Sequence, residues 1–156
     1  MMKLEGLNED FRDVVLLFAD AKVEFLIVGA YALSIHGAPR ASGDIDLFVR
    51  ASPDNAARVV AALDGFGAPL AAHGVSATDF ARAGTVYQIG LPPRRIDVLT
   101  QISGVTFDEA WASRTEAELD GRTIPIIGRD AFLKNKRAAG RPKDLADAAR
   151  LEKPKR

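Results

Sequence analysis

Residues 28–49 read VGAYALSIHGAPRASGDIDLFV, and this stretch decides how the rest of the chain is interpreted. It opens at the end of a short apolar run, residues 25–28, which is typical of a buried strand. Residues 30–35 then favour a short helix that stops at Gly37. From residue 44 to residue 50 apolar and polar residues alternate, which predicts a strand with one apolar face. The stretch therefore predicts a strand, a short helix and a second strand.

The chain on either side continues this mixture of helices and strands. Further helices are predicted over residues 8–18, 52–63, 130–139 and 142–151, and from the capping box of Thr106 and Glu109. Further strands are predicted over residues 85–91, 95–101, 115–119 and 122–127. The turn signals Pro92-Pro93 and Asp120-Gly121 join these strands into two hairpins, and Gly65 marks the end of the helix that starts at Ser52. We therefore expect one α/β (α+β) domain over residues 1–156, with a mixed sheet flanked by helices.

The composition excludes several classes of site. The 156 residues include no Cys and only two His, His36 and His73. Disulfide frameworks, thiolate nucleophiles and Cys-rich or His-rich zinc sites are therefore not expected. The sequence also has no Walker-type phosphate loop, no Gly-x-Ser-x-Gly and no His-Glu-x-x-His.

Charge and hydropathy indicate the cellular compartment in which the protein is expected. The first ten residues carry acids where a secretory signal would be basic and then apolar, and the apolar runs are too short to span a bilayer. We therefore expect a cytoplasmic protein without membrane contact. Residues 129–156 hold ten Lys or Arg against four Asp or Glu. This basic end either meets phosphate or forms a solvated pair of charged helices.

Gly29 and Ala30 lie where the first strand is expected to pass into the short helix. The first amides of a helix lack intrahelical partners, and a glycine there lets a phosphate approach the backbone. A tight turn is the alternative reason for Gly29.

Asp44 and Asp46 form the centre of the stretch. Residues two apart on a strand share a face, so both carboxylates project together. Adjacent carboxylates repel each other, and Mg2+ resolves that conflict because it binds through one or two carboxylates and substrate phosphates. The alternative is that both side chains face water or pair with Arg40, Arg50 or Arg95.

Asp97 interrupts the otherwise apolar strand of residues 95–99, where a charge is costly without a partner. If this strand lies beside the strand of Asp44 and Asp46, three carboxylates converge. That arrangement suits two metal ions about 4 Å apart, which stabilise the attacking and leaving oxygens of an in-line displacement. The alternative for Asp97 is an ion pair with Arg94 or Arg95.

The combination of Gly-Ala, a spacer, Asp-Ile-Asp and a later strand Asp resembles the nucleotidyltransferase fold of the DNA polymerase beta superfamily. Within it, residues 28–47 look closest to the bacterial abortive-infection toxin type (AbiEii-like) and its small relatives. Residues 134–147, which read KNKRAAGRPKDLAD, are similar to the ending of such proteins. The resemblance covers residues 25–151.

The resemblance implies roles for the same residues. Asp44 and Asp46 match the metal-binding pair, and Asp97 matches the third carboxylate, which helps to activate the incoming hydroxyl. Gly29 matches the phosphate-facing glycine. The family often has Gly-Gly or Gly-Ser at this point, whereas this chain has Ala30, which lacks a hydroxyl for phosphate.

Three further residues are candidate contacts to the nucleotide. Arg40 and Ser42 precede the carboxylate pair and either touch phosphate or ribose or fix the loop. Lys136 is a candidate for neutralising triphosphate charge, because phosphoryl transfer depends mostly on positioning and electrostatics. A plain surface position is the alternative for Lys136.

The function that follows is a magnesium-dependent transfer of a nucleoside monophosphate from a nucleoside triphosphate to a protein or RNA acceptor, such as a tRNA end. The resemblance places this activity in a toxin–antitoxin or phage-defence system, with a cognate toxin or antitoxin as partner. The alternative is a catalytically weak or inactive nucleotidyltransferase-like module that acts by binding a partner. Ala30 and the shortness of the chain relative to such toxins motivate the alternative.

Overall fold

A computed structural model describes residues 1–39, 43–91 and 94–153 of the chain. Its strands are β1 (Met2–Lys3), β2 (Phe25–Val28), β3 (Ile45–Val49), β4 (Val86–Ile89), β5 (Ile96–Leu99), β6 (Thr115–Leu119) and β7 (Arg122–Ile126). Its helices are α1 (Glu9–Asp20), α2 (Ala30–Ile35), α3 (Pro53–Phe66), α4 (Ala77–Phe80), α5 (Phe107–Ala112), α6 (Arg129–Ala139) and α7 (Pro142–Glu152). The strands form one mixed sheet in the order β1-β6-β7-β2-β3-β5-β4. The predicted α/β class, a mixed sheet flanked by helices, is therefore confirmed.

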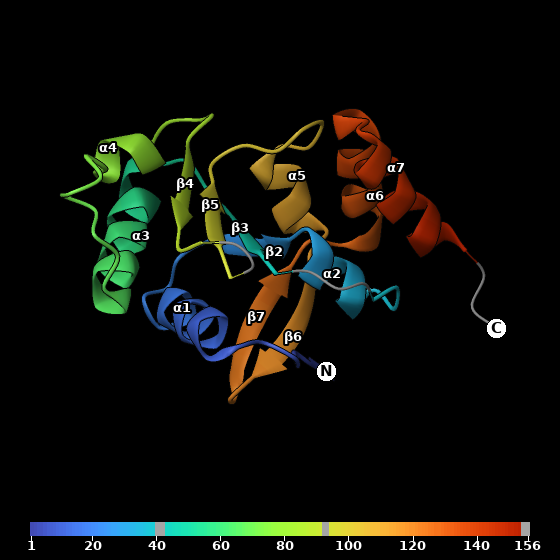
Figure 1. Cartoon of the computed structure of the whole chain (residues 1–156), viewed down its shortest axis with the longest axis horizontal. Coiled ribbons are helices and arrows are strands. Elements are labelled where there is room, and N and C mark those ends of the chain that lie inside the picture. The colour runs from blue at the N-terminus through green and yellow to red at the C-terminus, as the bar shows by residue number, and fades with distance from the viewer. Residues whose placement is uncertain (40–42, 92–93, 154–156) are drawn as a thin grey trace.

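The sheet is covered on both sides. Helices α1, α3 and α4 lie on one side, and α5, α6 and α7 lie on the other (Figure 1). Strand β2 is fully buried between them because all four of its residues are apolar. None of the helices in the described part of the chain combines the length and apolar character that crossing a membrane requires.

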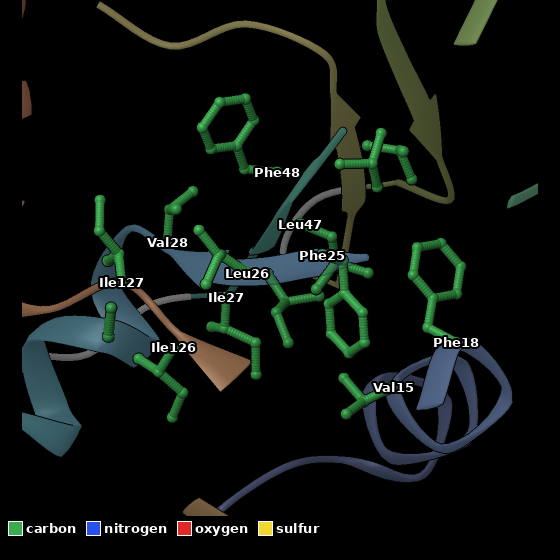
Figure 2. Packing of buried hydrophobic residues seen from close by; sticks show 14 of the residues in the cluster. Val15, Phe18, Phe25, Leu26, Ile27, Val28, Leu47, Phe48, Ile126 and Ile127 are labelled. Carbon is green, nitrogen blue, oxygen red and sulfur yellow. The ribbon is translucent and has the colours of Figure 1, made fainter. Parts of the chain in front are cut away.

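The alternating side chains of β2 supply both halves of the core. Phe25 points towards α1, where its ring meets Phe18 edge-on with ring centroids 5.4 Å apart (Figure 2). Val28 points to the opposite side, where Phe48 of β3 also lies (Figure 2). Phe48 is buried against Phe107 of α5, so β3 has apolar contacts on both faces rather than on one face as predicted. The difference arises because β3 lies inside the sheet and α5 covers the face that carries Asp46 and Phe48.

The local signals predicted most element ends. Both hairpins form, β4 with β5 and β6 with β7, and the second turns through Asp120 and Gly121, which both have positive φ. Pro92 and Pro93 lie outside the described residues. Helix α3 does not end at Gly65 but continues to Phe66, and Gly67 terminates it with a φ of 92°. The short β1 and α4 were not predicted, because two and four residues are too few to show a period.

The register of the central strands positions the polar residues. β3 runs antiparallel to β2 and parallel to β5, and Asp46 is the register partner of Val28 on one side and Asp97 on the other. A parallel pair needs a crossover connection, which α3, α4 and β4 provide here. Residues 51 positions apart in the sequence therefore lie side by side on the face that α5, α6 and α7 cover.

Candidate active site

The predicted site residues that the structure describes line one cavity of about 580 Å³. These residues are Gly29, Ala30, Asp44, Asp46, Asp97 and Lys136. The same cavity is also lined by Gly43, Gln88, Arg95, Leu99, Arg141 and Lys143. The remaining candidates, Arg40 and Ser42, lie outside the described residues. Strands β3, β4 and β5 and helices α2, α6 and α7 all contribute residues to the cavity.

Asp46 and Asp97 are neighbours because their strands pair in register. Asp97 is 8% exposed, and Asp44 comes one residue before β3 begins. Burial, followed by the charge of Asp97 and a hydrogen bond with it, raises the pKa of Asp46 from 3.8 to about 6. The charge of Lys136 lowers the pKa of Asp46, but it does not outweigh burial and the charge of Asp97.

Gly29 is required by this arrangement. Its φ of 73° and ψ of −151° fall in a backbone region that is essentially restricted to glycine. A Cβ on Gly29 would lie 2.5 Å from Oδ2 of Asp46, which is closer than real contacts allow. The glycine therefore allows the Asp46 carboxylate to lie against the start of α2. Ala30, the first residue of α2, contributes no hydroxyl, so only its backbone amide can serve an anion there.

Arg95 lies between two of the carboxylates. Its Nε is 2.9 Å from Oδ1 of Asp97, and its Nη2 is 3.3 Å from Oδ2 of Asp97 and 3.3 Å from Oδ2 of Asp44. Its backbone N–H also donates to Oδ1 of Asp44 at 3.2 Å. Of the alternatives left open by the sequence, Arg95 is thus the partner of both carboxylates, whereas the adjacent Arg94 is exposed.

A basic wall, Lys136, Arg141 and Lys143, faces the carboxylates across the cavity. Lys136 is only 8% exposed, and its Nζ lies 3.4 Å from Oδ1 of Asp144 and 3.4 Å from Oδ2 of Asp147. The Lys136 side chain is therefore not a plain surface lysine but part of a buried ion network between α6 and α7.

Asp144 connects two members of the basic wall. It is 0% exposed and accepts from Nε of Arg141 at 2.6 Å and from Nη2 of Arg141 at 3.2 Å, besides its contact with Lys136. Burial alone raises the pKa of Asp144, but the hydrogen bond and charge of Arg141 and the charge of Lys136 outweigh it and hold the pKa below its usual value. Asp144 is thus an ionised buried carboxylate that fixes both cations near the cavity.

The donor set of the cavity fits Mg2+. Asp46 and Asp97 are carboxylates in contact, and burial followed by the charge of Asp97 raises the pKa of Asp46, so a hard divalent cation would favour the ionised form of both. Among the described residues, no three acidic or histidine side chains are already gathered as a metal centre. The guanidinium of Arg95 instead supplies positive charge to Asp44 and Asp97.

Arg141 and the positioning role of Asp144 are features that sequence reasoning did not find. The signal for them was the segment Arg141-Pro-Lys-Asp144, in which Asp144 is also the N3 residue of a capping box with Arg141 at the N-cap. The approach of Lys136 from the preceding helix is a tertiary contact, and the helical period of α7 alone does not show it.

The raised pKa of Asp46 makes its charge a cost to the folded, metal-free protein. The change Asp46→Asn should raise the free energy of unfolding in EDTA at pH 8 by about 1 to 3 kcal/mol, the range that a pKa displaced from 3.8 to about 6 represents. The gain should shrink as the pH falls through 6 and vanish below the unfolded-state pKa near 4. Urea unfolding over pH 3.5–8 measures this difference in the free energy of unfolding, and the change Asp13→Asn at an exposed position is the control. A gain that does not depend on pH would contradict this explanation.

The lowered pKa of Asp144 predicts the opposite effect of a neutral substitution on the free energy of unfolding. The change Asp144→Asn should lower the free energy of unfolding at pH 7 by about 3 to 5 kcal/mol, because it leaves Lys136 and Arg141 short of a buried partner. The loss should diminish as the pH falls below the ordinary carboxyl pKa near 4 and then through the lowered pKa of Asp144 in the folded protein, where the wild-type carboxylate is protonated as well. Glu152→Gln is the matched control, because it removes an exposed ion pair with Arg137 between the same two helices. That control should cost less than about 1 kcal/mol, and equal losses for the two variants would refute the buried network.

Comparison with known proteins is informative at the level of structure. By sequence, the chain matches no protein-family profile and no curated protein. By structure, it is similar to the lincomycin-bound lincosamide antibiotic adenylyltransferase LnuA, with a TM-score of 0.53 and 14% identity over 95% of this chain and 98% of that chain. An antigenic nucleotidyltransferase-like protein from Paracoccidioides brasiliensis has a TM-score of 0.49 and 14% identity over 93% of this chain and 77% of that chain. Together with the mixed sheet and its helices, the likeness to LnuA shows that this chain has the nucleotidyltransferase fold.

Proposed function

We propose that this protein is a nucleotidyltransferase that moves a nucleoside monophosphate from a nucleoside triphosphate to an acceptor hydroxyl, with Mg2+ as cofactor. One observation carries the proposal. Carboxylates from the β3 and β5 region and cationic side chains from α6 and α7 face one another across a single cavity. A metal–triphosphate complex needs both, because the metal is bound by carboxylates and the phosphates by cations.

Each side of the cavity has its own task in this proposal. Asp44, Asp46 and Asp97 would hold the metal. Lys136 and Arg141 would bind the phosphates, since Asp144 holds both in place before any ligand arrives. Prepositioned charge is effective in transfer reactions because it costs no reorganisation when the reaction occurs. The backbone at Gly29 and Ala30, and Arg40 and Ser42, complete the expected nucleotide contacts.

The reaction is an in-line displacement at the α-phosphorus. The acceptor oxygen forms a bond to the α-phosphorus, and the bond from that phosphorus to the bridging oxygen of the β-phosphate breaks. Pyrophosphate leaves, and its negative charge faces Lys136 and Arg141. The proton of the acceptor hydroxyl passes to the Asp97 carboxylate, which is the most buried of the three carboxylates that face the cavity. Bound Mg2+ supplies Lewis-acid stabilisation of the charge on the reacting phosphate.

The proposed acceptor is a protein or RNA hydroxyl, such as a tRNA end. The biological setting that the sequence favours is a toxin–antitoxin or phage-defence system with a cognate partner in the cytoplasm. The name of LnuA says that it adenylylates a lincosamide antibiotic, and a small-molecule hydroxyl is therefore included among the acceptors to be assayed.

The first test of the proposal is nucleotide binding. Isothermal titration of ATP, GTP, CTP and UTP should show magnesium-dependent binding of at least one triphosphate, because both halves of the site are needed for the complex. The double change Asp44→Ala/Asp46→Ala should abolish that dependence. If no triphosphate binds to the wild-type protein, the domain is not an enzyme of this kind and acts by binding a partner.

The second test separates chemistry from binding. The change Asp97→Asn removes the proton acceptor and should lower the rate of monophosphate transfer, followed with α-labelled triphosphate, by about 10²- to 10⁴-fold. Triphosphate binding should fall much less, because the basic wall and the two carboxylates of Asp44 and Asp46 are unchanged. The exposed Arg58→Ala serves as control and should leave both quantities unchanged. Full transfer activity in Asp97→Asn would remove Asp97 from the proposed mechanism.

A further inference from the structure

The guanidinium of Arg95 lies where positive charge is needed to balance the carboxylates. It contacts Asp97 through Nε at 2.9 Å and Asp44 through Nη2 at 3.3 Å, so one planar group bridges two of the three carboxylates that would hold a metal. Both contacts raise the pKa of the Arg95 guanidinium further, as does the charge of Asp46. Arginine suits this bridging position because its fork of donors stays charged at every physiological pH.

Two other cations of the cavity are already bound to buried carboxylates. Lys136 is held by Asp144 and Asp147, and Arg141 is held by Asp144 through two hydrogen bonds. Arg95 instead contacts the carboxylates of the proposed metal site, and it is two residues away from Asp97. Arg95 is therefore the cation that a metal ion would have to displace from Asp44 and Asp97.

We propose that Arg95 is a resident counter-ion of the metal site, which must release Asp44 and Asp97 before a divalent cation binds and then contributes its charge to the triphosphate. This inference rests on the proposed function, because it concerns the same site. In the metal-free protein the guanidinium stabilises the carboxylates. Once displaced, it still lines the cavity that Lys136, Arg141 and Lys143 line.

The consequence is a coupling between metal and triphosphate. A metal ion alone has to displace Arg95 without compensation, whereas a metal ion that arrives with a triphosphate offers the guanidinium a new anionic partner. Each ligand therefore favours binding of the other, and this coupling is reciprocal. Metal binding without nucleotide is correspondingly weak, which keeps the site from being loaded until the donor is present.

Arg95→Gln tests the proposal, with Arg94→Gln as matched control. Arg94 is the adjacent residue, carries the same charge and is exposed. The probes are Mn2+ and Mg2+ for the metal, and inorganic tripolyphosphate with either metal for the donor, all followed by isothermal titration. Arg95→Gln should bind Mn2+ about tenfold more tightly than the wild-type protein, which is the size of one charge-assisted hydrogen bond. It should bind tripolyphosphate more weakly in the presence of metal, and Arg94→Gln should change neither affinity.

A second variant keeps the test valid if Arg95→Gln proves unstable without metal. Arg95→Lys retains the charge but cannot bridge two carboxylates through a planar fork, so its Mn2+ affinity should lie between those of the wild type and Arg95→Gln. Thermal unfolding in EDTA checks that each variant is folded.

The outcomes separate this proposal from the proposed function. Equal Mn2+ affinity in the wild type and in both Arg95 variants would show that Arg95 does not compete with the metal, while leaving the nucleotidyltransferase intact. Weaker Mn2+ binding in the Arg95 variants would make Arg95 a scaffold of the site and overturn its role as a counter-ion. Absence of Mn2+ binding in the wild type and in both Arg95 variants would overturn the counter-ion, and absence of binding in the presence of tripolyphosphate as well would refute the metal-dependent function.

Discussion

The parallel pairing of β3 with β5 is the constraint on which the rest of the site depends. Because this register sets Asp46 beside Asp97, the sheet brings together like charges on a face that helices cover. Such a pair is unfavourable unless one group takes up a proton or a cation lies nearby. The protein shows both responses, a raised pKa at Asp46 and a guanidinium against Asp97.

Helices α6 and α7, which close the site, carry a second cluster of charged residues, and this cluster presents positive charge to the cavity. Asp144 is buried completely, yet it remains ionised because Arg141 and Lys136 surround it. A buried ion network seldom adds net stability compared with an apolar core of the same shape. Here the network fixes the positions of two cations, Lys136 and Arg141, at the wall of the cavity. The charge that would be costly in the core is thus placed where an anionic ligand can use it.

The sequence predicted the parts of this arrangement that depend on local pattern. The spacing of Asp44 and Asp46 places both carboxylates on one face, and the apolar neighbours of Asp97 marked it as unusual. Gly29 was assigned to a turn or to a phosphate. Its conformation supports the turn, and the contact that a Cβ would make with Asp46 gives a further reason that no local pattern could reveal. The sequence left Arg94 and Arg95 open as partners of Asp97, although the two-residue spacing of Arg95 and Asp97 already favours Arg95, the partner that the structure shows.

The charges that line the described part of the cavity support a ligand of a particular kind. Three carboxylates and four cationic side chains meet there, and the carboxylates lie on the sheet side while three of the cations lie on the helix side. A ligand with one sign of charge would satisfy only half of this surface. A divalent metal bound to a polyphosphate presents positive charge to one side and negative charge to the other, and so matches both. The fourth cation, Arg95, lies on the carboxylate side, where it contacts Asp44 and Asp97.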